Sequence, residues 1–115
     1  MRQLRGRAAI ITGASRGLGT YIGRALGAEG VSLALMARSA EELERVAAEM
    51  RALGVRAIAI AGDVTSADDR RRAIEATLAE YGRADILVNN AGIEDTAHFE
   101  LQPAEEIAAT IDVNL

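Results

Sequence analysis

The sequence predicts an α/β fold in which a doubly wound parallel sheet lies between two layers of helices. Short apolar runs rich in β-branched residues alternate with longer segments of helical periodicity along the whole 115-residue chain. The apolar runs are almost unbroken, which is typical of strands covered on both faces. Right-handed crossover connections then predict the strand order 3-2-1-4.

The first predicted unit joins a strand, a helix and a second strand. The run RAAIIT (7–12) predicts the first strand. A helix is expected over about 17–29, and it carries the apolar residues Ile22 and Leu26. The run VSLALMA (31–37) predicts the second strand, so the unit has the β-α-β order of a parallel sheet.

The second predicted helix covers about 40–53. Its start has Ser39 and Glu42 at the spacing of a capping box, and Gly54 follows its end. One apolar face is formed by residues at helical spacing, namely Leu43, Val46, Ala47, Met50 and Leu53. The run RAIAIA (56–61) then predicts the third strand.

Two further helices and a strand complete the predicted pattern. Thr65 and Asp68 are expected to cap a third helix, which ends at Gly82 and whose apolar face holds Ile74, Leu78 and Tyr81. The run DILVNN (85–90) predicts the fourth strand. Pro103 suits the first turn of a last helix, on which apolar residues recur every four positions at Ile107, Ile111 and Leu115.

Composition excludes several classes of function. The net charge of −4 gives no electrostatic basis for binding nucleic acid or an anionic membrane. The chain has no cysteine, which excludes thiol chemistry, and no metal site is expected. No apolar run approaches the ~18 residues that span a bilayer, and the N-terminus lacks a signal peptide, so a cytoplasmic location is expected. All 13 basic residues are arginine.

Three glycines follow the first predicted strand at the spacing Gly-x-x-x-Gly-x-Gly. Between a strand and a helix, such glycines predict a loop that cradles the phosphates of a dinucleotide. Gly13 would allow a tight turn, Gly17 a close approach of the backbone to the pyrophosphate, and Gly19 close packing of helix on strand. The alternative is a structural turn that binds no ligand.

Four short motifs stand along the chain in a fixed order, namely TGASRGLG (12–19), GDVT (62–65), NNAG (89–92) and VNL (113–115). Together they resemble the short-chain dehydrogenase/reductase family, and the resemblance covers the whole chain. It implies a Rossmann-type fold and hydride transfer between a nicotinamide cofactor and a ketone or secondary alcohol. Within the family, the chain looks most similar to 3-oxoacyl-carrier-protein reductases and to sugar or polyol dehydrogenases.

The residues after the second predicted strand favour NADP over NAD. NAD-binding sheets place an acidic residue there for the ribose 2′-hydroxyl, but this chain has Ala37 followed by Arg38. A guanidinium can bind a 2′-phosphate through two hydrogen bonds. Arg16 would reach the same phosphate from the glycine loop, with Ser15 and Ser39 as hydroxyl donors. The alternative is that Arg38 is an ordinary exposed loop residue.

The resemblance assigns further residues to the cofactor. Asp63 would accept a hydrogen bond from the adenine amino group, with Val64 beside the ring, although Asp63 could equally cap the following turn. Leu18 belongs to the phosphate loop. The residues expected to line the adenosine ribose are Asn90, Ala91 and Gly92, whereas Asn89 is expected to be structural.

The catalytic group that the resemblance implies is largely missing. Asn114 matches the asparagine of the family's proton relay, which is expected on a helix. The family's proton donor is a tyrosine followed four residues later by lysine, but neither Tyr21 nor Tyr81 has this neighbour and the chain contains no lysine. Arginine cannot relay protons, since its pKa stays above ~12. His98 is expected to be a solvated loop residue.

These observations predict that residues 1–115 are the NADP-binding N-terminal half of a reductase, inactive alone. The full-length form is expected to act on a small carbonyl or alcohol and to form a dimer or tetramer. Two alternatives stay open: a non-catalytic NADP-binding module, and a half-domain that pairs with a partner through the apolar edge of the fourth strand.

Overall fold

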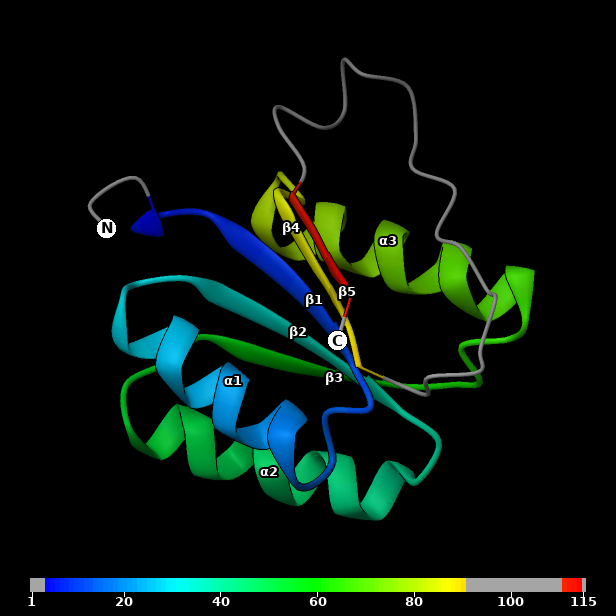
Figure 1. The fold of residues 1–115 in the computed structure, drawn as a ribbon, viewed down its shortest axis with the longest axis horizontal. Helices are drawn as coiled ribbons and strands as arrows, with labels where there is room; N and C mark the ends of the chain where they lie inside the picture. Colours follow the sequence, from blue (N-terminus) through cyan, green and yellow to red (C-terminus); the bar gives the residue numbers. More distant parts are fainter. Residues whose placement is uncertain (1–3, 91–110, 115) are drawn as a thin grey trace.

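The computed structural model describes residues 4–90 and 111–114, and gives the side chains of residues 4–90 only. This part of the chain holds one parallel sheet with the strand order β3-β2-β1-β4-β5 (Figure 1). The strands are β1 (Ala8–Thr12), β2 (Ser32–Ala37), β3 (Ala57–Ala61), β4 (Ile86–Asn89) and β5 (Ile111–Asn114). The helices are α1 (Leu18–Ala28), α2 (Ala40–Ala52) and α3 (Ala67–Tyr81). The predicted α/β class and the order 3-2-1-4 are confirmed.

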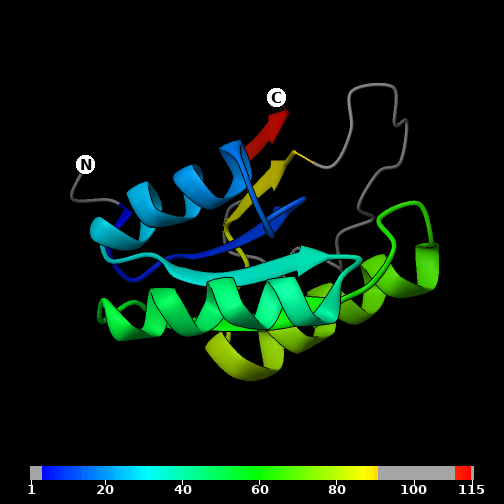
Figure 2. The ribbon, with the colours of Figure 1, turned by 90° about the horizontal axis from the view of Figure 1, so that it is seen from below.

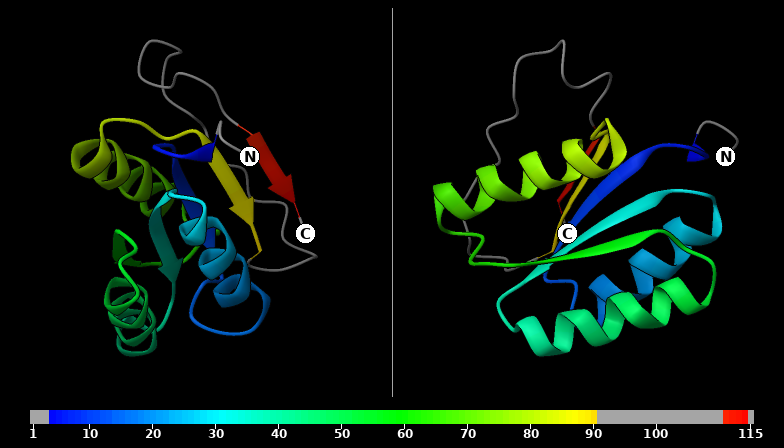
Figure 3. Two further views of the ribbon diagram at one scale, coloured as in Figure 1. Left: turned by 90° about the vertical axis from the view of Figure 1, so that its left-hand side faces the viewer. Right: turned by 180° about the vertical axis from the view of Figure 1, so that it is seen from behind.

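Two helices cover one face of the sheet and one helix covers the other (Figure 1, Figure 3). On the first face, the strand residues Ile11, Leu33 and Leu35 are completely buried and pack with Leu43 and Met50 of α2. On the second face, the buried residues form a separate cluster with α3, namely Ile10, Ala34, Met36, Ile60, Ala73, Ile74 and Leu87. Successive strand residues therefore contribute to different layers, which explains why the apolar runs are unbroken.

The predicted last helix is wrong over the residues that the structure describes there. Ile111–Asn114 forms β5, which pairs in parallel with β4 and sets Asn114 opposite Asn89 (Figure 2, Figure 3). The spacing of Ile111 from its apolar neighbours suits a helix, but Ile and Val at alternate positions suit a strand equally well. Pairing with β4 satisfies backbone groups that an unpaired edge would leave open. The edge of β4 that the half-domain alternative would offer to a partner is therefore occupied by β5, while Pro103 and Ile107 lie outside the described residues.

The N-terminal caps of α2 and α3 agree with the predicted caps, with one exception. Ser39 accepts a hydrogen bond from the Glu42 amide at 3.2 Å, as the capping box predicts. At α3 the cap is Ser66, which accepts from the Asp69 amide at 3.2 Å, so the predicted Thr65 cap is wrong by one residue. The Thr65 hydroxyl instead donates to the Asp63 carboxylate at 2.7 Å. Among these short polar residues, the loop geometry decides which one reaches the helix amides.

A buried carboxylate ties two neighbouring strands together at their amino ends. Asp85 is only 1% exposed and accepts a hydrogen bond from the Ala8 amide at 2.9 Å. Arg83 donates two hydrogen bonds to this carboxylate at 2.7 and 2.9 Å, and Arg7 forms an ion pair with it at 3.3 Å. Burial by itself raises the pKa of Asp85, but the hydrogen bonds from Arg83 and Ala8 outweigh it and hold the pKa below its usual value.

In the described part of the chain, no helix is long and apolar enough to cross a membrane.

Candidate functional site

The candidate site lies at the carboxyl edge of the sheet, where the loops after β1, β2 and β3 meet. The ends of β1 and β2 are joined by a hydrogen bond from the Ala14 amide to the Met36 carbonyl at 3.2 Å. The Gly62 amide likewise donates to the Ala37 carbonyl at 2.9 Å, which joins the ends of β2 and β3. Loops far apart in sequence are therefore held side by side at the edge where open α/β sheets bind ligands.

The backbone of the glycine loop has a positive φ at two positions, and both are occupied by glycine. Gly13 has a φ of 61° and Gly17 a φ of 63°, in the region that side chains disfavour. Gly17 precedes α1, whose first turn has no side-chain cap. The amides of that turn are therefore open to an anion, and they carry the positive end of the helix dipole. Leu18 follows with 54% of its surface exposed.

Gly19 marks a close approach within this loop. A Cβ atom placed on Gly19 would lie 2.8 Å from Nδ2 of Asn90 and 3.1 Å from Cα of Ala14, and closer still to the carbonyl oxygen of Gly13. Contacts this short are not tolerated between rigid backbone atoms. The third glycine of the motif therefore lets α1 start directly against the loop and β4, as its spacing predicts.

A hydroxyl outside the predicted set of site residues organises the end of β4. Thr12 is fully buried, and its Oγ1 accepts a hydrogen bond from the Asn90 amide at 2.8 Å. The same hydroxyl lies 3.2 Å from Oδ1 of Asn89, and Nδ2 of Asn90 donates to the Gly13 carbonyl at 3.3 Å. Thr12 could have been found from its place, because a hydroxyl at the buried end of a strand must find partners.

Asp63 is held in place from two directions. Its amide donates to Oδ2 of Asp69 at 2.8 Å, and its carboxylate accepts hydrogen bonds from the hydroxyl and the amide of Thr65. These two bonds outweigh partial desolvation, and the positive charge of Arg38 adds to them, so the pKa of Asp63 lies below its usual value. The predicted turn-capping role of Asp63 is confirmed. Its carboxylate is ionised at neutral pH.

The other predicted cofactor residues are placed as follows. Arg16, Arg38 and Ser39 are exposed, and Ser15 is half-buried. Val64 is 9% exposed, and its side chain packs in the core under α3. Only its backbone is therefore available to a ligand at this edge. Ala91 and Gly92 lie outside the described residues.

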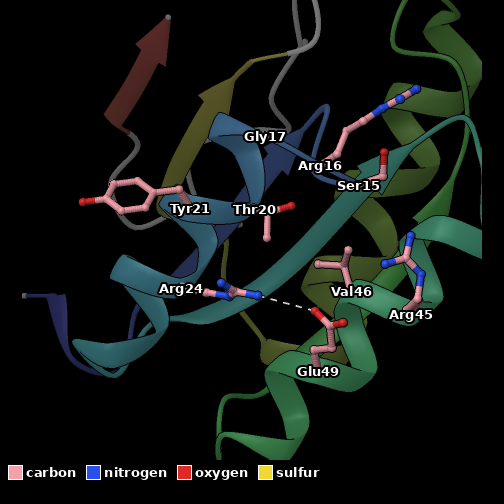
Figure 4. A pocket seen from close by; sticks show the side chains of 9 residues that line it. All are labelled: Ser15, Arg16, Gly17, Thr20, Tyr21, Arg24, Arg45, Val46 and Glu49. Atoms are coloured by element: carbon pink, nitrogen blue, oxygen red, sulfur yellow. Dashed lines mark hydrogen bonds and ion pairs between the residues drawn. The ribbon is translucent and has the colours of Figure 1, made fainter.

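A hollow of about 420 Å³ opens between the glycine loop and α2 (Figure 4). Ser15, Arg16 and Gly17 line it from the loop, and Arg45 and Glu49 line it from α2. Figure 4 shows the guanidinium of Arg45 directed toward the part of the loop that carries Ser15. The hollow is thus continuous with the loop predicted to hold phosphate.

A comparison with protein families shows to which family this chain belongs. Residues 7–115 match the family model described as short chain dehydrogenase. The chain belongs to the short-chain dehydrogenase family. Members of this family are oxidoreductases that bind NAD(P). The resemblance that the four motifs carry is confirmed.

Relatives within the short-chain dehydrogenase family span the whole chain. The 3-oxoacyl-[acyl-carrier-protein] reductase of Synechocystis is 39% identical over 100% of this chain and 47% of its own length. Among solved structures, L-sorbose reductase from Gluconobacter frateurii, complexed with NADPH and L-sorbose, is 37% identical with a TM-score of 0.74, covering 76% of this chain and 34% of its own. A variant of actinorhodin polyketide ketoreductase with NADPH is 40% identical with a TM-score of 0.72, covering 75% and 33%. The chain spans roughly a third to a half of the length of the curated relatives that it matches.

The catalytic residues of a short-chain dehydrogenase are not assembled by the described residues. Tyr81 donates its hydroxyl to the Leu33 carbonyl at 2.7 Å, and burial raises its pKa to about 12. Tyr21 is 70% exposed on α1, and no lysine exists to accompany either residue. The backbone of Asn114 lies in β5 and not on the expected helix, while His98 lies outside the described residues.

Proposed function

We propose that this chain binds NADP(H) as the cofactor-binding part of an oxidoreductase that transfers hydride between NADP(H) and a ketone or secondary alcohol. One observation carries the cofactor preference. The residue after β2 is an exposed arginine, Arg38, where an NAD-binding sheet would place a carboxylate. The complexes of L-sorbose reductase and of actinorhodin polyketide ketoreductase with NADPH support the proposal.

The residues at the carboxyl edge fit such a cofactor. The uncapped amides at the start of α1, together with Gly13 and Gly17, would bind the pyrophosphate. The ionised Asp63 would accept from the adenine amino group, beside the backbone of Val64. Ribose contacts are assigned to Asn90, Ala91 and Gly92, and phosphate-loop contacts to Ser15, Leu18 and Gly19.

The 2′-phosphate would lie between the loops that follow β1 and β2. Arg16 and Arg38 would supply charge-assisted hydrogen bonds, and Ser15 and Ser39 would donate from their hydroxyls. This arrangement discriminates by charge. A dianionic phosphate gains from two guanidinium groups, whereas the ribose hydroxyls of NAD gain much less.

The bound dinucleotide would supply or accept the hydride, and the carbonyl would need a proton from the protein. Asn114 is proposed for that proton relay. The proposed substrate is a small carbonyl, reduced as in 3-oxoacyl-carrier-protein reductases, or the corresponding alcohol, oxidised in the reverse direction. We further propose that the enzyme is a cytoplasmic dimer or tetramer.

Calorimetric titration of NADP⁺ and NAD⁺ into the protein and its variants tests the cofactor preference. Wild type should bind NADP⁺ more tightly, and Arg38→Ala should lose about 10- to 100-fold in NADP⁺ affinity, the worth of a charge-assisted hydrogen-bond pair. Arg38→Asp should prefer NAD⁺. Arg71→Gln is the control for loss of one positive charge, because Arg71 lies on α3 and, among the described residues, pairs with the exposed Asp68. Equal affinities of wild type for the two dinucleotides would contradict the proposal.

A further inference from the structure

Most arginines in the described part of the chain have a partner, but those around the glycine loop do not. Arg7 and Arg83 pair with Asp85, Arg24 with Glu49, Arg51 with Glu44, Arg71 with Asp68 and Arg72 with Asp69. Arg56 lies over the Tyr81 ring, and Arg70 donates to the Val64 carbonyl. In contrast, Arg16, Arg38 and Arg45, like Arg5 before β1, form no ion pair or hydrogen bond within residues 4–90. These three guanidinium groups therefore belong to the β1–α1 loop, the β2–α2 loop and α2, the helix that follows the second loop.

Arg45 lies beside the glycine loop in the fold, although the sequence separates it from that loop. It lines the same hollow as Arg16 and Ser15 (Figure 4). It stands six residues after the α2 cap Ser39, which is a rise of about 9 Å along the helix. Helical side chains lean toward the N-terminus of their helix. This tendency favours conformers in which the Arg45 side chain reaches toward the start of α2, which follows Arg38 and Ser39.

The acidic residues nearby do not neutralise Arg45. Glu41 and Glu49 stand four residues before and after it, where a helical ion pair would form, yet neither lies within ion-pair distance. Glu49 is instead paired with Arg24 across the hollow at 3.5 Å. The positive charges of Arg16, Arg38 and Arg45 repel one another, and a bound anion would offset that repulsion.

We propose that Arg45 supplies a third guanidinium for the 2′-phosphate of the cofactor and is a specificity-determining residue beside Arg16 and Arg38. This inference rests on the proposed function, because it assigns a further residue to the same phosphate. A phosphomonoester carries close to two negative charges and three acceptor oxygens at neutral pH. Three guanidinium groups arriving from the β1–α1 loop, the β2–α2 loop and α2 match those oxygens in number and sign.

Two substitutions with opposite expected effects test the third guanidinium. Arg45→Gln should weaken NADP⁺ binding about tenfold and leave NAD⁺ binding within about twofold. Glu49→Gln removes the partner of Arg24 and the only acidic side chain lining the hollow among the described residues, so it should tighten NADP⁺ binding about two- to threefold. A gain in affinity cannot arise from a misfolded variant. Arg71→Gln serves again as the remote control for loss of one positive charge.

Calorimetry with NADP⁺, NAD⁺ and 2′-AMP separates the outcomes. If wild type prefers NADP⁺ but Arg45→Gln behaves like Arg71→Gln, the third guanidinium is overturned and the proposed function stands. If Arg45→Gln weakens NADP⁺ and NAD⁺ equally, the residue acts elsewhere on the cofactor or on the fold, and the inference is again overturned. If wild type shows no preference and does not bind 2′-AMP, the proposed NADP function itself fails.

Discussion

Substitution of Gly19 by alanine tests the close approach at the start of α1. The new Cβ would begin 2.8 Å from Nδ2 of Asn90, and ordinary contact begins at 3.4 Å, so these atoms must separate by about 0.6 Å. The displacement must be larger at the Gly13 carbonyl, which is backbone and cannot rotate away. Overpacking of this kind costs about 1–3 kcal/mol, and the helix propensity of alanine returns about 1 kcal/mol of it.

The expected result is a small loss of stability and a larger loss of binding. Urea unfolding of Gly19→Ala should give a free energy of unfolding lower by up to about 2 kcal/mol. Affinity for NADP⁺ and for NAD⁺ should fall equally, by about tenfold or more, because a shifted loop loses backbone hydrogen bonds to the pyrophosphate that both cofactors share.

The control is the same substitution one helical turn later. A Cβ on Gly23 would meet Cε of Met50 at 2.9 Å, the end of a flexible side chain that can move aside. Gly23→Ala should therefore keep wild-type affinity for both dinucleotides. The reasoning is refuted if Gly19→Ala binds them as tightly as Gly23→Ala does.

Two further predictions concern stability. Asp85→Ala should lower the free energy of unfolding by about 2–3 kcal/mol, since it removes the acceptor of the Ala8 amide and of Arg83. The exposed Asp68→Ala should change it by less than about 1 kcal/mol. The pKa of Asp85 is depressed in the folded state, so its contribution to the free energy of unfolding is full above the unfolded value of about 4 and is lost as the pH falls below it. The free energy of unfolding of Asp85→Ala should therefore depend less on pH in that range. The same loss of stability in acid as in wild type would contradict this. Tyr81→Phe removes the hydrogen bond to the Leu33 carbonyl and should cost about 1 kcal/mol in urea unfolding, while a cost near zero would mean that water replaces the hydroxyl.

The order of elements could be predicted because its signals are local. Strands β1 to β4 and helices α1 to α3 begin and end within a few residues of their predicted bounds, since apolar periodicity, Gly17, Gly54 and Gly82 act on neighbouring residues. The cap of α3 was misplaced by one residue because Thr65 and Ser66 have similar chemistry. Ile111–Asn114 was misassigned because its apolar spacing fits both periods.

The sequence alone also determined the family and the glycine loop. Motif spacing depends only on neighbouring positions, and the expected role of Gly19 follows from its place in the motif. The predicted roles of Arg16 and Arg38 rest on local positions too, because Arg16 lies within the glycine loop and Arg38 directly follows β2.

The tertiary structure alone decided which distant residues meet. Crossovers bring Thr12 into contact with Asn90, and Asp85 into contact with the Ala8 amide. They also place Arg45 on the same hollow as the loop of Arg16. No local signal marks such contacts, because each depends on the parallel register of the strands and on the packing of a helix across them. That packing places the unpaired Arg45 beside the predicted phosphate loop.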